Sequence, residues 1–150
     1  MHSSPFRRIL VGANGKPESE RAVEVAISLA KSLGAQVIVL GVIAPLSAET
    51  QAEGVGLEEA SNAYVQIQEQ VRKIAAAAHD LGVDMVSEVV DGDPEKEIES
   101  KSDEVSADLI VVGHRDISRV RRWLEGSTSE KLVQTSKASV LVVHDDRPKQ

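Results

Sequence analysis

The sequence predicts an open α/β sheet of five parallel strands with four helices on both faces, built as one domain. Short apolar runs alternate along the chain with longer segments of helical periodicity, the order typical of this class. The runs are apolar at nearly every position, as in strands that are covered on both faces. A chain of 150 residues suits one hydrophobic core, which we place at about residues 7–145 between short disordered termini.

The first part of the chain predicts a strand, a helix and a second strand. Arg8–Ala13 and Gln36–Ile43 are apolar runs bounded by turn residues. Pro17 opens the helix between them, and Gly34 ends it. The helix has apolar residues at helical spacing, namely Ala22, Val23, Ala26, Ile27, Ala30 and Leu33. Residues 44–56 follow as a loop that is long for a compact domain.

A long helix follows this loop and ends at Gly82. It has one apolar face, made by Ala60, Tyr64, Ile67, Val71, Ile74, Ala78 and Leu81. A coiled-coil seam has the same spacing, but alanine and tyrosine within only three heptads favour packing against a sheet.

The next part of the chain predicts a third strand, a third helix and a fourth strand. The strands cover residues 84–90 and 108–113. Asp93 supplies an N-cap and Pro94 a first-turn proline for a helix over residues 95–105.

The last part of the chain predicts a fourth helix and a fifth strand. A capping-box sequence begins the helix over residues 127–136, and the strand runs from Ser139 to His144. Right-handed crossovers then join the strands. In such sheets ligands bind beyond the carboxyl ends of the strands, where the winding reverses. The loops at residues 13–16 and 114–126 are therefore the places to look for a site.

Composition and charge argue against several classes of partner. The net charge is −7, and residues 49–104 alone carry 15 acidic and 4 basic side chains, so we expect no nucleic-acid or anionic-membrane partner. Phe6, Tyr64 and Trp123 are the only aromatic residues, too few for base stacking. The chain has no cysteine and no apolar run as long as a membrane span, which leads us to expect a cytoplasmic protein.

Motifs for catalysis and metal binding are absent from the sequence. Residues 12–16 have only two residues between their glycines, and Pro17 follows the lysine, so this segment is not a Walker phosphate loop. The four histidines never stand at metal-ligand spacing, and no nucleophile-elbow sequence occurs. We therefore predict no catalytic residue and no protein-held metal.

The start of the predicted fourth helix is the strongest candidate for an anion site. Free N–H groups and the positive end of the helix dipole lie there, and Gly126 permits a close approach to the backbone. Ser127 alternatively only caps the helix, and Gly113 alternatively only forms a turn. The basic residues within residues 114–122 indicate either an anion site or a solvated surface.

Four segments together carry a family resemblance: residues 9–19 (ILVGANGKPES), 90–94 (VDGDP), 107–113 (ADLIVVG) and 126–143. The pattern of a glycine, two residues, a second glycine, nine residues, then a glycine and a small polar residue falls on Gly113-His114-Arg115-Asp116, nine residues, then Gly126-Ser127, with Asp116 at the second glycine. On these segments the chain resembles the universal stress protein family, a branch of the adenine-nucleotide α-hydrolase-like fold.

The resemblance implies a Rossmann-like sheet ordered 3-2-1-4-5 that binds ATP or another adenine nucleotide, with Mg²⁺ as a possible companion. Ala13 and Asn14 would border the adenosine, and Val42 would present its backbone to the adenine. The phosphates would be surrounded by Gly113, His114, Arg115, Gly126, Ser127 and Thr128. A homodimer through the last strand, Ser139 to His144, is also implied.

Two residues depart from the pattern of the ATP-binding members. Asn14 replaces their usual aspartate, and an amide oxygen still accepts a ribose hydrogen bond. Asp116 replaces their second glycine, and a carboxylate about 4 Å from a phosphate charge costs about 4 kcal/mol at an effective dielectric near 20. Arg115 and Arg119 could neutralise that carboxylate, Mg²⁺ could bridge it to the phosphates, or the side chain could turn outward.

Two functions therefore stay open at this point. One is a regulatory stress-response module that binds an adenine nucleotide and hydrolyses it little or not at all, because neither a positioned base nor a P-loop lysine is present. The other is a nucleotide-free dimeric interaction protein of the same fold. An active hydrolase or an electron-transfer flavoprotein subunit is disfavoured by the short chain.

Overall fold

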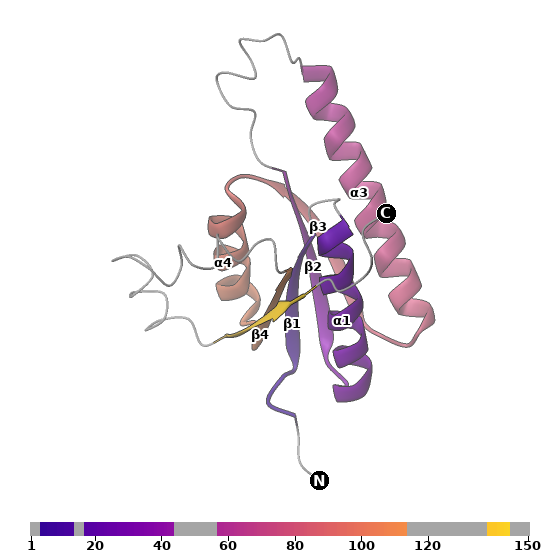
Figure 1. Ribbon diagram of the computed structural model, residues 1–150, viewed down its shortest axis with the longest axis vertical. Helices are drawn as coiled ribbons and strands as arrows, with labels where there is room; N and C mark the ends of the chain where they lie inside the picture. The colour runs from indigo at the N-terminus through magenta and orange to yellow at the C-terminus, as the bar shows by residue number, and fades with distance from the viewer. Residues whose placement is uncertain (1–3, 14–16, 44–56, 114–137, 145–150) are drawn as a thin grey trace, which may run out of the picture.

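The computed structural model describes residues 4–13, 17–43, 57–113 and 138–144. Five strands form one sheet in the order β3-β2-β1-β4-β5, and every neighbouring pair is parallel (Figure 1). The predicted fold class and strand order are thereby confirmed. The strands are β1 (Arg8–Ala13), β2 (Gln36–Ile43), β3 (Met85–Asp91), β4 (Leu109–Gly113) and β5 (Ser139–Val143).

Helices cover both faces of the sheet within the described residues. α1 (Pro17–Leu33) and α3 (Leu57–Asp80) lie on one face, and α4 (Pro94–Val105) lies on the other (Figure 1). The fourth predicted helix, over residues 127–136, and the predicted loop over residues 44–56 lie outside the described residues.

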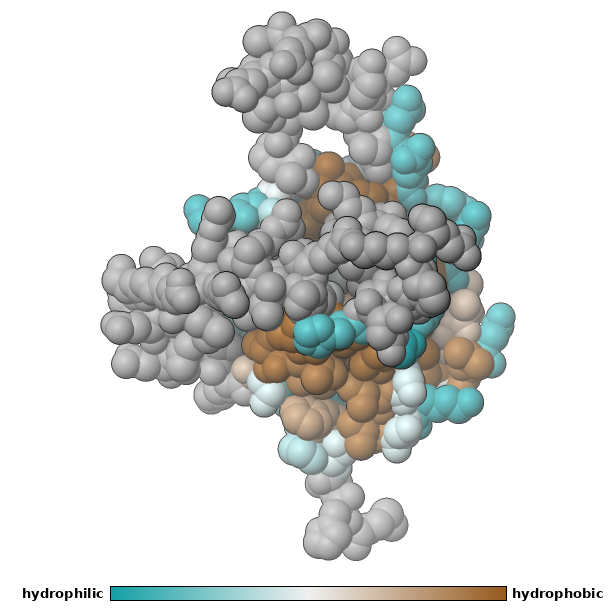
Figure 2. Space-filling view, viewed as in Figure 1, coloured by the Kyte–Doolittle hydropathy of each residue, from teal (hydrophilic) through white to brown (hydrophobic). Residues whose placement is uncertain are grey.

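Alternation along the strands builds two cores, one on each face of the sheet. Ile9 and Val11 of β1 face α1 and α3, whereas Leu10 between them faces α4. All three side chains are completely buried because β1 is the central strand. Figure 2 shows hydrophobic residues gathered in the lower part of the face it presents and hydrophilic ones along its right side.

Strand ends differ from the predicted ones by single residues, for local reasons. Asp108 was expected to begin the fourth strand, but its carboxylate accepts hydrogen bonds from the backbone N–H groups of Arg7 and Arg8 at 2.7 and 2.9 Å. Asp84 accepts a hydrogen bond from the side chain of Gln36 at 3.1 Å just before β3 begins. The side chains of both aspartates therefore fasten strand starts, while their backbone groups continue the hydrogen bonding between the strands by one residue.

Two residues expected on buried helix faces are instead exposed. Leu81 is 52% exposed because α3 ends at Asp80 and Gly82, with φ of 82°, turns the chain away. Leu33 is 38% exposed in the last turn of α1. Of the other α3 residues expected on the buried face, Val71 and Ala78 are buried.

Two glycines let helices approach the carboxyl halves of β1 and β2 closely. A Cβ atom on Gly41 of β2 would lie 2.7 Å from Cγ2 of Ile67 in α3. A Cβ atom on Gly12 of β1 would lie 3.1 Å from Cδ1 of Ile98 in α4. The first contact cannot relax by a simple swing of a side-chain end, because Cγ2 is attached to the branched Cβ of Ile67.

We predict that Gly41→Ala destabilises the protein by about 1–3 kcal/mol through overpacking against α3. Gly12→Ala serves as the matched control and should cost less, because the Cδ1 end of Ile98 can turn aside. Urea unfolding of both variants measures the difference. Equal stabilities would show that α3 shifts freely over β2.

Candidate functional site

The sheet opens at the carboxyl ends of β1 and β4. Ala13 ends β1, Gly113 ends β4, and parallel strands bring both ends to the same edge of the sheet. The register between the two strands extends only to the pair Val11 and Val111. The last two residues of each strand therefore lie beyond the paired stretch, at the position where the winding of the chain reverses.

Val42 presents a main-chain carbonyl beside this opening. Gln36 donates its backbone N–H to the carbonyl of Arg7 at 2.9 Å, so the even-numbered residues of β2 direct their backbone groups toward β1. β1 ends at Ala13, whose partner in the register is Gly41. The carbonyl of Val42 thus points to the side of β1, one residue beyond the last pair of the described register, Ala13 and Gly41.

The side chains of these strand ends are used for packing, so their backbone is what remains for recognition. Ala13 is 4% exposed and belongs to the core under α1 and α3. Val42 is 7% exposed and belongs to the core under α4. The structure therefore brings Ala13, Val42 and Gly113 to one edge of the sheet, and their role in binding stays a prediction. The other predicted site residues lie outside the described residues: Asn14, His114, Arg115, Asp116, Gly126, Ser127 and Thr128.

Two helices that support this edge contribute residues that the sequence did not single out. Ile98 of α4 lies over Gly12, one residue before the end of β1. Ser19, 2% exposed in the first turn of α1, is a buried polar side chain close in sequence to the end of β1. No local pattern reveals the contact of Ile98 with the neighbouring strand, and Ser19, the last residue of the segment 9–19, was given no site role.

A buried cation fastens α4 to the edge strand β3. Nζ of Lys101 donates hydrogen bonds to Oε2 of Glu88 at 2.5 Å and forms an ion pair with Oε2 of Glu104 at 2.9 Å. The hydrogen bond to Glu88 raises the pKa of Lys101 above its ordinary value, although burial works against it. A lysine within an acidic helix suggests an exposed position, so no local pattern marks Lys101 for this role.

The part of the chain that the structure describes contains neither a metal-binding cluster nor a membrane-spanning helix. There, no cluster of three or more histidine, aspartate or glutamate side chains could hold a metal ion. Among the same residues, no helix has the length and apolarity needed to cross a lipid bilayer.

Comparison with known proteins places the whole of this sheet in one family. The model described as "Universal stress protein family" matches residues 5–144. A universal stress protein of Methanocaldococcus jannaschii is 30% identical over 145 residues, covering 92% of this chain and 82% of that protein. One from Bacillus subtilis is 29% identical over 147 residues, covering 92% and 99%.

Solved structures share the same architecture. A universal stress protein crystallised in complex with cAMP is 31% identical, with a TM-score of 0.64 and coverage of 94% of this chain and 99% of that one. A universal stress protein of Lactobacillus plantarum is 21% identical, with a TM-score of 0.71 and coverage of 93% and 99%, and supports the fold alone.

The ion pair of Lys101 yields a prediction about pH. We expect Glu88→Gln to lower the free energy of unfolding by about 1 kcal/mol near neutral pH, because one partner of the pair is solvent-accessible. Because the pKa of Lys101 is raised in the folded protein, the ion pair contributes its full stabilisation below the pKa of an unfolded lysine, about 10.4. This stabilisation disappears as the pH rises through the pKa of Lys101 in the folded protein.

Urea unfolding of wild type and Glu88→Gln from pH 7 to pH 11.5 checks this sign. The difference in free energy of unfolding between wild type and Glu88→Gln should be constant up to about pH 10 and become smaller above it. Glu104→Gln is the matched control with a smaller effect, since that carboxylate is 66% exposed. A gap that widens with pH would contradict the assignment.

Proposed function

This chain belongs to the universal stress protein family, and from that premise we propose that it binds an adenine nucleotide at the carboxyl ends of β1, β2 and β4. The binding makes it a regulatory module of the stress response, contained in one domain over about residues 7–145. The cytoplasmic location expected from composition stays a prediction.

The observation that carries the proposal is the opened edge between β1 and β4, flanked by the carbonyl of Val42. An adenine ring is recognised there by main-chain groups, and Ala13 and Asn14 border the ribose. The 31% identical structure holds cAMP, which supports an adenine nucleotide as the ligand class. Small residues at the strand ends favour a flat ring, because the backbone can be approached closely.

The phosphates extend from Gly113 into the segment that follows β4. They are surrounded in this proposal by Gly113, His114, Arg115, Gly126, Ser127 and Thr128. Main-chain N–H groups at a helix start bind phosphate without a dedicated side chain. ATP with Mg²⁺ is the ligand we favour, because the metal would also neutralise Asp116.

Hydrolysis in this site should be slow or absent. Phosphoryl transfer is accelerated mainly by positioning and by stabilisation of charge in the transition state. The chain offers no P-loop lysine and no positioned base in its motifs. The bound nucleotide therefore acts as a signal whose presence changes the stability and surface of the protein.

ATP with Mg²⁺ at about 100 times its dissociation constant should stabilise the fold by about 2.7 kcal/mol. For a domain of this size, that corresponds to a rise of several degrees in melting temperature. Differential scanning calorimetry with ATP, AMP and cAMP measures it. No shift with any of the three would favour the nucleotide-free interaction protein instead.

Removing the carboxylate of Asp116 extends this test. Asp116→Gly should tighten ATP binding, by up to about a thousandfold where the full charge repulsion is removed. Asp91→Asn is the matched control, because it removes a carboxylate at the end of a different strand. Isothermal titration gives both affinities, and weaker binding by Asp116→Gly would indicate that Asp116 holds the metal.

The edge strand β5 favours the homodimer that the resemblance implies. Val140 is 43% exposed and Leu141 is 36% exposed, on a strand whose sole neighbour among the described strands is β4. An apolar edge strand invites pairing with another chain. We propose that two copies pair through β5.

Val140→Lys should therefore yield a monomer, because strand pairing would bury the added charge. Val86→Lys at the opposite edge is the matched control, since Val86 is 48% exposed on β3 and lies outside the proposed interface. Sedimentation equilibrium measures both masses. A dimer that survives Val140→Lys but not Val86→Lys would place the interface on β3.

A further inference from the structure

The carboxylate of Glu97 lies against the backbone of Gly92, just past the carboxyl end of β3. A Cβ atom on Gly92 would lie 2.6 Å from Oε1 of Glu97 and 2.9 Å from its Cδ. Gly92 also has a φ of 152°, a conformation that other residues rarely adopt. The glycine therefore supplies both the turn and the space that hold this carboxylate at the carboxyl edge of the sheet.

Glu97 and the next residue of α4 reach the ends of two different strands. Ile98 lies over Gly12, near the end of β1. Glu97 lies over Gly92, whose N–H donates to the carbonyl of the last residue of β2 at 3.0 Å. β2 runs between these two contacts, and Ile98 packs against the core that contains Val42. Because neighbouring strands are about 4.8 Å apart, the carboxylate lies about one strand spacing from the carboxyl end of β2.

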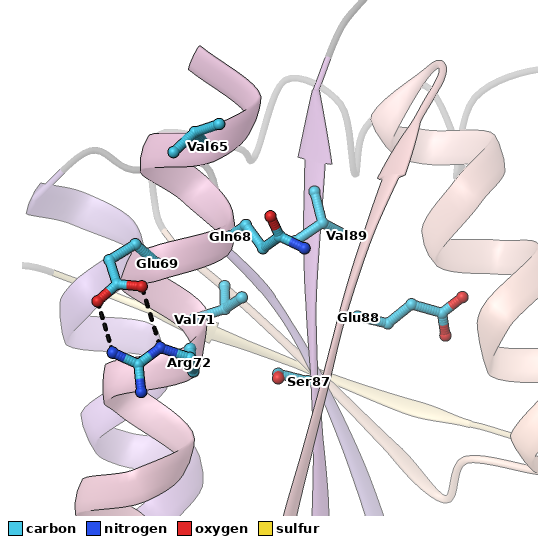
Figure 3. A pocket seen from close by; sticks show the side chains of 8 residues that line it. All are labelled: Val65, Gln68, Glu69, Val71, Arg72, Ser87, Glu88 and Val89. Carbon is cyan, nitrogen blue, oxygen red and sulfur yellow. Dashed lines mark hydrogen bonds and ion pairs between the residues drawn. The ribbon is translucent and has the colours of Figure 1, made fainter. Parts of the chain in front are cut away.

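Other carboxylates beside β3 are already paired. Glu69 and Glu88 help to line a groove of about 440 Å³ between α3 and β3, and Figure 3 shows Glu88 pointing away from α3. Glu69 accepts hydrogen bonds from Arg72. Glu88 accepts one from Lys101. By contrast, the carboxylate of Glu97 forms no ion pair or hydrogen bond with the described residues, so it is available to a ligand.

A carboxylate beside a purine distinguishes the groups at the 6-position of the ring. At neutral pH it only accepts hydrogen bonds. Adenine carries an amino group there, which donates, whereas guanine and hypoxanthine carry an oxygen, which accepts. An oxygen facing the carboxylate would leave both acceptors without a donor, and this lowers affinity. A carboxylate at this position therefore favours adenine.

We propose that Glu97 accepts a hydrogen bond from the 6-amino group of the bound adenine and selects adenine over purines with a 6-oxo group. The inference rests on the proposed function, which places the ring beside the carboxyl end of β2. The backbone of Val42 orients the ring, and Glu97 adds the side chain that recognises its 6-position. Gly92 keeps the place of the carboxylate open.

Binding of ATP and of ITP, each with Mg²⁺, tests this on the whole chain. The two nucleotides share sugar and phosphates and differ only at the 6-position and the adjacent ring nitrogen. Glu97→Gln keeps the shape of the side chain, and its amide donates as well as accepts. By isothermal titration, its preference for ATP over ITP should be about tenfold smaller than that of wild type. Glu99→Gln is the matched control and should keep the wild-type preference, because it lies about 200° around α4 from Glu97.

Glu97→Ala provides a second variant, which removes the carboxylate without adding a donor. It should also reduce the preference for ATP, whereas loss of a purely structural side chain would change both affinities alike. An unchanged preference in both variants, with ATP binding by wild type intact, would overturn the inference and leave the proposed function standing. No binding of either nucleotide to wild type would overturn the proposed function, and the role of Glu97 with it.

Discussion

The remainder of the structure depends on one constraint: from the central strand β1, the chain winds in one direction to β2 and β3 and in the opposite direction to β4 and β5. The chain leaves β1 through α1 on one face and reaches β4 through α4 on the other. At the carboxyl edge, the ladder between β1 and β4 ends two residues before the strands do. The same reversal creates a core on both faces and an opening at one edge.

The opening is bordered by main-chain groups because the side chains nearby are needed for the two cores. Ala13 and Val42 are buried on opposite faces, and Gly12 and Gly41 let α4 and α3 approach closely. Stability and recognition thus share the same few residues. The ion pair between Lys101 and Glu88 contributes from a distance, since it fastens α4 and with it the contact of Ile98 on Gly12.

Local sequence predicted the strands well where an apolar run ends in a turn residue. The bounds of β1 and β2 agree with prediction, because both strands are central and their ends are marked by small or polar residues. The starts of β3 and β4 were less predictable, since Asp84 and Asp108 bond to neighbouring strands that only the fold brings close. For the same reason the sequence could not reveal Lys101 as a buried cation.

Of the candidate site, the sequence identified the strand ends that meet at the opening, but their joint geometry emerged only from the register. The ladder between β1 and β4 and the direction of the Val42 carbonyl depend on pairing, which no local pattern encodes. The roles of Asn14, Asp116 and the residues around Ser127 stay predictions. The two edge strands also differ in composition, since β5 has no charged residue, whereas β3 carries Glu88 and Asp91.

The most direct measurement of the central claim is a titration of ¹⁵N-labelled protein with ATP and Mg²⁺, followed residue by residue through the backbone amide shifts. Our account predicts saturable shifts that are largest at Ala13, at Val42 or Ile43, and at Gly113, all with one dissociation constant. Shifts confined to the groove between α3 and β3, or no shifts at saturating nucleotide, would contradict it.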